Sequence, residues 1–216
     1  MHRNSELIFA RHARALFTPG STVLEIGPDA CPSTYQRVVG AGPSQWCTAD
    51  LDTSVDGTGR RIFGAGEGTD VTFPMASPYE IPVGDDSFDV VLSGQVIEHV
   101  PRIWAWMAEL ARVCRPGGHV VTIGPLSWPY HEAPVDCWRI YPEGMRALCA
   151  DAGLEVVVST FECLEDPRPR RSYPGGNLGN ATGMKARVLR LAGAVGWPLP
   201  IALDTITIAR KPEGNQ

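Results

Sequence analysis

Apolar and polar positions change period along the chain, and the changes predict alternating helices and strands. Apolar residues between 5 and 17 recur at helical spacing and stop at Pro19-Gly20, which predicts an N-terminal helix. Helical patterns also occupy 101–114 and 142–152. Short apolar runs typical of buried strands lie at 23–26, 88–92, 119–123, 154–158 and 203–209. This alternation predicts a mostly parallel sheet with helices on both faces.

Two segments do not follow the alternation. Residues 54–70 are rich in glycine and polar residues and predict a long surface loop. Residues 165–200 predict an insertion over the functional site, with a helix at about 182–194. We therefore expect a single domain over 1–216, in which the helical segment 1–20 and the insertion 165–200 form a cover.

Composition and charge exclude several classes of protein. The chain has 216 residues, and 19 Lys and Arg against 24 Asp and Glu give a net charge of -5. No basic run of five residues occurs, so a nucleic-acid interface is not expected. The six cysteines lack C-x-x-C spacing, and no segment has the length or apolarity of a membrane span. We expect a cytoplasmic protein with no membrane partner.

The segment VLEIGPDACP at 23–32 carries the first candidate chemistry. A buried strand ends in Glu25, Ile26 and Gly27, and ligands of open α/β sheets bind at the carboxyl ends of strands. Only the first glycine of a dinucleotide-binding G-x-G-x-x-G pattern is present, which disfavours a phosphate cradle. A carboxylate such as Glu25 suits a cationic or amino-bearing ligand.

This segment resembles the first motif of the class I S-adenosylmethionine-dependent methyltransferases, in which an acidic residue lies two positions before a glycine-rich turn. The segment 46–51 resembles the second strand of that family, and 74–82 resembles the stretch beside the adenine. The segments 85–100 and 110–122 resemble the fourth strand with its loop, and the helix, Pro-Gly-Gly turn and fifth strand. The resemblance covers about 20–160 and implies a Rossmann-like, seven-stranded, mostly parallel sheet and S-adenosylmethionine as cofactor.

The resemblance also implies a set of cofactor-binding residues near the carboxyl ends of the strands. Asp50 would take the ribose hydroxyls, and the backbone near Ser77 and Gly94-Gln95 would lie against the cofactor. The chain departs from the family at Pro28-Asp29-Ala30, where further glycines are usual, and at Ser77, where Asp is frequent. The full set is Glu25, Gly27, Pro28, Asp50, Leu51, Ala76, Ser77, Gly94 and Gln95.

A proton acceptor for methyl transfer is expected in the loops after the fourth and fifth strands. His131 is the first candidate, supported by Asp136 or His99. The loop around His131 carries aromatic and polar residues that suit a sugar, with Trp128, Tyr130 and Trp138 available for stacking. Two structural interpretations remain open: an ion pair between Asp136 and Arg139, and a loop-ordering role for His99.

A divalent metal site is a further candidate in the same loops. Oxygen-rich ligands would favour Mg²⁺, which would acidify a coordinated sugar hydroxyl. The alternative for Glu98 is a carboxylate at a helix N-terminus. The candidate ligands are Glu98, His99, His131, Glu132 and Asp136.

These expectations combine into one predicted function and several rivals. The small bacterial methyltransferases of sugars and secondary metabolites that the chain resembles imply O-methylation of a sugar, oligosaccharide or glycosylated metabolite. The rivals are N- or C-methylation of a small metabolite, an NAD-dependent oxidoreductase, and a noncatalytic cofactor-binding module.

Trp104 and Trp106 cannot share one helix face, which leaves one of them for a groove rim or a homodimer contact.

Overall fold

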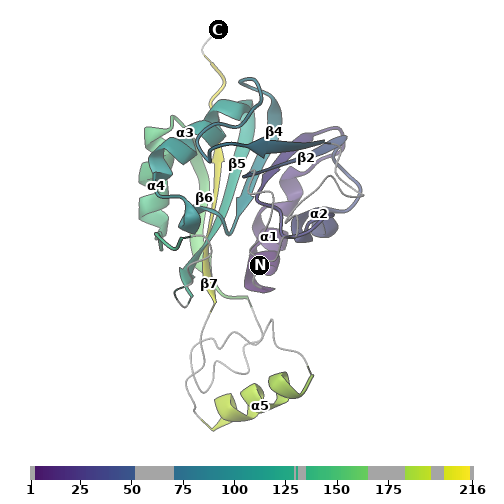
Figure 1. Ribbon diagram of the computed structural model, residues 1–216, viewed down its shortest axis with the longest axis vertical. Helices are drawn as coiled ribbons and strands as arrows, with labels where there is room; N and C mark the ends of the chain where they lie inside the picture. The colour runs from purple at the N-terminus through teal and green to yellow at the C-terminus, as the bar shows by residue number, and fades with distance from the viewer. Residues whose placement is uncertain are drawn as a thin grey trace.

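The computed structural model describes residues 3–51, 71–128, 130, 135–164, 183–195 and 202–214. Its centre is a seven-stranded sheet in the order β3-β2-β1-β4-β5-β7-β6 (Figure 1). Neighbouring strands are parallel except at β7, which is antiparallel to both β5 and β6. The strands are β1 (Thr22–Ile26), β2 (Gln45–Leu51), β3 (Val71–Met75), β4 (Phe88–Gly94), β5 (Cys114–Ser127), β6 (Glu155–Glu162) and β7 (Leu203–Arg210). The predicted mostly parallel sheet is confirmed.

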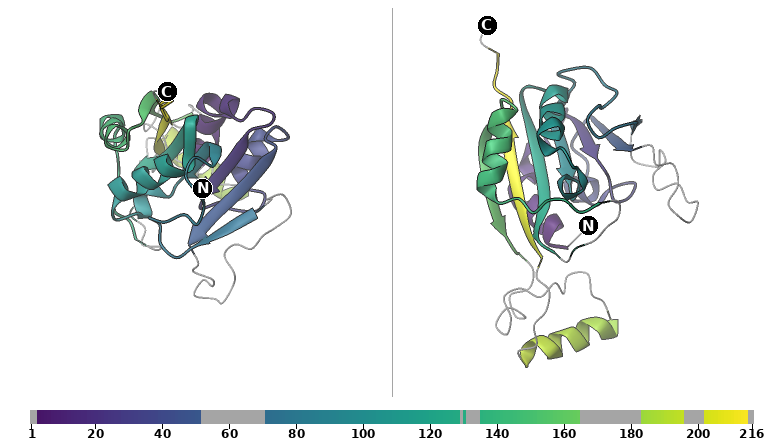
Figure 2. Two further views of the ribbon diagram at one scale, coloured as in Figure 1. Left: turned by 90° about the horizontal axis from the view of Figure 1, so that it is seen from above. Right: turned by 60° about the vertical axis from the view of Figure 1, so that its left-hand side comes forward.

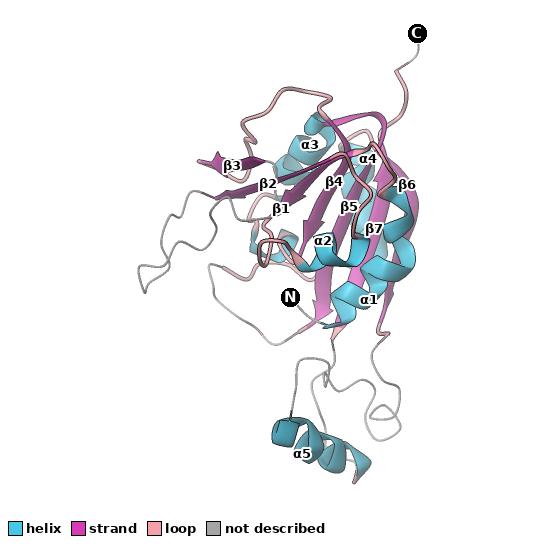
Figure 3. Cartoon of the chain, turned by 90° about the vertical axis from the view of Figure 1, so that its right-hand side faces the viewer, coloured by secondary structure: helices cyan, strands magenta, loops and turns pink. Residues whose placement is uncertain are grey.

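Helices cover both faces of the sheet, as the alternating pattern predicts. The helices α1 and α2 pack on one face, and α3 and α4 pack on the other (Figures 2 and 3). The helices are α1 (Arg3–His12), α2 (Thr34–Val39), α3 (Ile103–Val113), α4 (Pro142–Asp151) and α5 (Gly183–Ala194), with short 3-10 turns η1 (Arg14–Leu16) and η2 (Ile97–His99). None of the helices in the described part of the chain combines the length and apolarity needed to cross a bilayer.

Strand alternation divides the core into two layers. In β1, Val23 packs toward α1 and α2, whereas Leu24 packs toward α3 and α4. Phe9 of α1 and Tyr35 of α2 complete the first layer, and their ring centroids lie 4.6 Å apart. Because both faces of the strands are buried, their sequences are nearly continuous apolar runs.

Element boundaries differ from the sequence pattern at a few places. The helix predicted over 5–17 ends at His12 and continues as the separate 3-10 turn η1. The strand predicted over 119–123 extends from Cys114 to Ser127, because Cys114 pairs with Phe88 of β4 and β7 pairs from His119 to Ser127. Trp106 is fully buried and Trp104 is 53% exposed, which agrees with one tryptophan in the core and one outside it.

Candidate functional site

The carboxyl ends of β1, β2 and β4 bring three of the predicted site residues to one edge of the sheet. Glu25 lies near the end of β1, Asp50 near the end of β2, and Gly94 ends β4. The strand order reverses between β1 and β4, which is the position where open α/β sheets bind ligands. The predicted placement of the site at this edge therefore follows from the topology.

Glu25 is a buried carboxyl held by two donors. Its side-chain atom Oε2 accepts hydrogen bonds from Ser33 Oγ at 2.6 Å and from Trp46 Nε1 at 2.9 Å. Ser33 also caps α2 by accepting a bond from the Gln36 amide. Burial raises the pKa of Glu25 to about 7, and the two hydrogen bonds only reduce that rise. Glu25 therefore links the first strand, the loop after it and α2.

The two glycines of the predicted set are required by packing inside the chain. Gly27 has a φ of +64°, and a Cβ there would lie 2.7 Å from Val96 Cγ2. A Cβ on Gly94 would lie 2.2 Å from the hydroxyl oxygen of Tyr35, which is closer than any real contact. The loops after β1 and β4 thus touch each other and α2, so this edge is tightly built.

Asp50, near the end of β2, has one carboxylate oxygen that can still accept a hydrogen bond. Asp50 is half-buried, and its Oδ1 atom accepts a 2.8 Å hydrogen bond from the backbone amide of Leu51. Within the described residues no donor reaches the second carboxylate oxygen. Burial raises the pKa of Asp50, and the Leu51 amide opposes that rise. A carboxylate with one oxygen available fits the ribose hydroxyls that the resemblance assigns to it.

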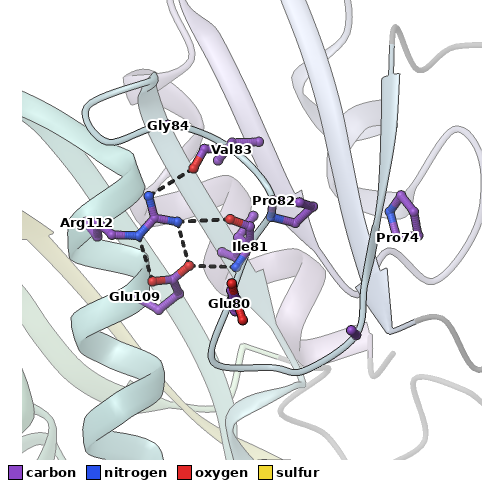
Figure 4. Close-up of a pocket in the computed structure, with 9 residues that line it drawn as sticks. Pro74, Glu80, Ile81, Pro82, Val83, Gly84, Glu109 and Arg112 are labelled. Carbon is purple, nitrogen blue, oxygen red and sulfur yellow. Dashed lines mark hydrogen bonds and ion pairs between the residues drawn. The ribbon is translucent and has the colours of Figure 1, made fainter.

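Ala76 and Ser77 follow β3, and Ala76 is among the residues that line a cavity of about 670 Å³, shown in Figure 4. The cavity is lined by Ala76 and by a paired Glu109 and Arg112 from α3. Arg112 also donates to the carbonyls of Ile81 and Val83, so its hydrogen-bonding groups fasten the 80–84 loop to α3. This arrangement is structural, and Ala76 is the one predicted cofactor residue that lines the cavity.

Gln95 belongs to a buried polar network that the sequence pattern did not reveal. Its amide Nε2 donates to Ser5 Oγ and to Asp204 Oδ1, both at 2.9 Å. Asn4 Nδ2 donates to the other oxygen of Asp204 at 2.7 Å. Asn4, Ser5 and Asp204 are all fully buried. The network joins α1, the loop after β4 and β7, and the Gln95 backbone amide donates to the Ile123 carbonyl at 2.7 Å, so Gln95 is held by the fold through both its side chain and its N–H.

Glu98 is the second buried carboxyl at this edge, on the 3-10 turn η2. It is 1% exposed, and its atom Oε2 has no hydrogen-bond partner among the described residues. Burial raises the pKa of Glu98 to about 7; the charge of Arg139 opposes this rise, and Asp204 and Asp136 add to it. A buried polar atom without a partner is costly, so it marks a place where a ligand group can bind.

His99 and Asp136 lie in the same region as Glu98. His99 Nδ1 contacts the carbonyl of Val135, and its Nε2 lies 3.8 Å from Glu98 Oε1. Both carboxylate oxygens of Asp136 contact the guanidinium of Arg139, with 2.7 Å between Oδ2 and Nη2. The ion pair and the loop-ordering contact that were open alternatives are therefore present in the structure. His131 and Glu132 lie outside the described residues.

The candidate metal ligands do not form a metal cluster in the part of the chain that the structure describes. No three His, Cys, Asp or Glu side chains converge there in a way that could hold an ion. The aromatic set is partly committed to the fold: Trp138 packs edge-on against Trp104, and its Nε1 donates to the Val100 carbonyl at 2.9 Å. Tyr130 is 70% exposed and available for contact.

Comparison with known proteins gives the site its family context. Residues 34–122 match the family described as a methyltransferase domain. An uncharacterized methyltransferase of Mycobacterium bovis is 41% identical over 91 residues, which cover 38% of this chain and 36% of the relative. A Mycobacterium ulcerans relative with the same description is 38% identical over 118 residues, covering 52% and 44%. The matches thus span less than half the length of these relatives.

Solved structures share the fold at low sequence identity. A chain from the complex between the Haloferax volcanii Trm112 methyltransferase activator and a methyltransferase superimposes with a TM-score of 0.64 and 19% identity, covering 99% of this chain and 92% of that one. These similarities show that the sheet order and the covering helices are those of the class I methyltransferase fold.

Proposed function

We propose that this chain is a class I S-adenosylmethionine-dependent methyltransferase, which transfers a methyl group from S-adenosylmethionine to a hydroxyl of a small, sugar-like molecule; the match of residues 34–122 to a methyltransferase domain and the shared fold support this proposal. The observation that carries the cofactor part of the proposal is Asp50, a half-buried carboxylate with one available oxygen at the carboxyl edge of β2, whereas the hydroxyl acceptor is inferred from the aromatic and polar residues of the loop around His131. The cofactor, when bound, supplies an electrophilic sulfonium methyl group. The chain then has to hold the cofactor, orient the acceptor and remove a proton.

Cofactor binding is assigned to the β1, β2 and β4 ends. Asp50 would accept hydrogen bonds from the ribose hydroxyls, and Glu25 would face the amino-bearing end of the cofactor. The two bonds to Glu25 both reach Oε2, which leaves Oε1 as an acceptor. The remaining members of the proposed cofactor set are Gly27, Pro28, Leu51, Ala76, Ser77, Gly94 and Gln95.

Proton removal is assigned to the loops after β4 and β5. In this proposal His131 takes the proton, with Asp136 or His99 as its partner. Since both oxygens of Asp136 already contact Arg139, Asp136 would act by fixing the loop that carries His131. Alignment of the acceptor with the methyl group supplies most of the acceleration, on the order of 7 to 11 kcal/mol in well-oriented systems.

The direct test is formation of S-adenosylhomocysteine with panels of acceptors. The full chain is incubated with S-adenosylmethionine and sugars or glycosides, amines, or carboxylates, each with Mg²⁺ and with a chelator. We expect turnover with a hydroxyl acceptor, and loss of about 10²-fold or more in His131→Ala. Turnover confined to amines would contradict O-methylation. Absence of product with every class of acceptor would contradict the proposed methyltransferase activity. Full activity in the presence of the chelator would contradict the predicted Mg²⁺ site at Glu98, His131 and Asp136.

A further inference from the structure

The helix α5 (Gly183–Ala194) exposes an apolar stripe. Met184, Val188 and Leu191, together with Val195 directly after the helix, are 72%, 58%, 68% and 76% exposed. Their spacing of four, three and four residues places them on one face of a helix. A stripe of this kind is normally buried against a partner surface. In Figure 1, α5 stands apart from the sheet and its covering helices.

The charge around the stripe is cationic, in contrast to the rest of the chain. Between residues 167 and 203 the sequence contains six Lys and Arg residues and no Asp or Glu, although the whole chain has a net charge of -5. Three of the six cations, Lys185, Arg187 and Arg190, belong to α5. The Arg187 side chain is exposed. Basic residues combined with an apolar stripe are typical of helices that bind the surface of an anionic membrane.

The length of α5 fits a helix that lies on a bilayer. Twelve residues rise about 18 Å, which is shorter than the hydrocarbon core of a bilayer, about 30 Å. A fluid surface needs only the stripe and the charge, whereas a protein partner would need a groove of matching shape. The strands on either side of this insertion, β6 ending at Glu162 and β7 starting at Leu203, meet it at the carboxyl edge of the sheet.

We propose that α5 docks on an anionic lipid surface, with its apolar stripe at the boundary between headgroups and acyl chains and its cations near the lipid phosphates. This contact is independent of the proposed methyl transfer, because it uses no residue of the candidate site. It places the carboxyl edge of the sheet toward the lipid, so an acceptor could be taken from the membrane surface.

The test is cosedimentation of the full chain with vesicles. One preparation contains phosphatidylcholine alone, and the second contains phosphatidylcholine with phosphatidylglycerol. We expect sedimentation with the anionic vesicles, weak sedimentation with the neutral ones, and release at high salt. In the double variant Val188→Asp/Leu191→Asp the partition coefficient should fall by about tenfold or more.

A matched control separates the stripe from general surface apolarity. Val157 of β6 is also 58% exposed, so Val157→Asp should bind anionic vesicles like the unchanged chain. Circular dichroism melts establish that both variants fold. The proposal is overturned if the unchanged chain stays in the supernatant, if the double variant binds equally well, or if polyglutamate captures the chain and anionic vesicles do not. The last result would assign the stripe to an acidic protein partner.

Discussion

Glu25 and Glu98 are both buried at the carboxyl edge of the sheet, and the pKa of each is raised to about 7, yet their surroundings differ. Glu25 has two donors, from Ser33 and Trp46, whereas Glu98 has an oxygen with no partner among the described residues. The β1 side of the site is therefore assembled by the chain itself. On the β4 and β5 side, the buried Glu98 Oε2 atom can form a hydrogen bond with a bound molecule. Under the proposed function, this contrast separates a prebuilt half for the cofactor from a half for the methyl acceptor.

The largest effect is expected from the tight packing of Gly94 at the end of β4 against Tyr35 of α2. Gly94→Ala would place a methyl group 2.2 Å from the hydroxyl oxygen of Tyr35 and 2.4 Å from its ring. Because Tyr35 is buried between α1 and the sheet, the free energy of unfolding should fall by about 3 kcal/mol or more. Urea denaturation measures the change. Gly84→Ala is the control, since its nearest neighbour would be 3.7 Å away. Equal stability of the two variants would contradict the close packing.

A pH series of unfolding sharpens the comparison of the two glutamates. In the folded state each carboxyl keeps its proton up to a pKa of about 7, while the unfolded chain releases it near the ordinary value of 4.5. The folded state therefore holds more protons between pH 4.5 and 7, and its stability falls as pH rises through that window. Each glutamate contributes about 3 kcal/mol to this fall.

Substitution of each glutamate by glutamine tests which surroundings matter. Glu98→Gln should be more stable than the unchanged chain at pH 8, by up to about 3 kcal/mol, because no buried charge has to form. Glu25→Gln should gain less at pH 8, since the charged form of Glu25 also accepts bonds from Ser33 and Trp46. Unfolding at pH 5 and pH 8 measures both. Destabilisation of Glu98→Gln at pH 8 would contradict the account of a buried Oε2 atom without a partner.

A smaller effect is expected for the ion pair of the acceptor half. Arg139→Gln leaves the Asp136 side chain, which is 2% exposed, without its cation. We expect a loss of about 2 kcal/mol in the free energy of unfolding, because the Arg139 side chain itself is still 25% exposed. The double variant Arg139→Gln/Asp136→Asn should recover part of this loss. A double variant no more stable than the single one would argue against the pairing as the cause.

The smallest effect is expected at the rim of the cavity beside β3. Asp85 contacts Arg112 at 2.7 Å, but its side chain is 73% exposed, so solvent screens the pair. Asp85→Ala should change the free energy of unfolding by less than about 0.5 kcal/mol. Thermal melts of the two proteins measure the difference. A larger loss in the free energy of unfolding would contradict the interpretation that solvent screens this surface ion pair.

The sequence predicts those parts of the molecule that local pattern determines. The strand entering Glu25-Ile26-Gly27, the helix of 142–152 and the helix near 182–194 appear in the structure within a few residues of their predicted places. These segments have a clear apolar period and end at glycines or prolines. The resemblance to class I methyltransferases, and with it the fold, rests on motifs of the same local kind.

Contacts between distant segments could not be predicted in this way. Gln95 bonds Asp204, 109 residues later, and Asp204 in turn bonds Asn4 of the first helix. No period in the sequence couples these positions, and the burial of Asn4 and Ser5 in the helix of 3–12 becomes visible only in the structure. The unpartnered oxygen of Glu98 is likewise a product of packing around η2 and Gly124. The proposed proton acceptor His131 stays a prediction.

The central claim is that the carboxyl ends of β1 and β2 bind the cofactor, and calorimetry with S-adenosylhomocysteine tests it most directly. We predict saturable binding to the unchanged chain, a loss of about tenfold or more in Asp50→Ala, and unchanged affinity in Asp85→Ala. NAD⁺ should bind neither the unchanged chain nor the variants. Absence of S-adenosylhomocysteine binding, or equal affinity in Asp50→Ala and the unchanged chain, would contradict the account.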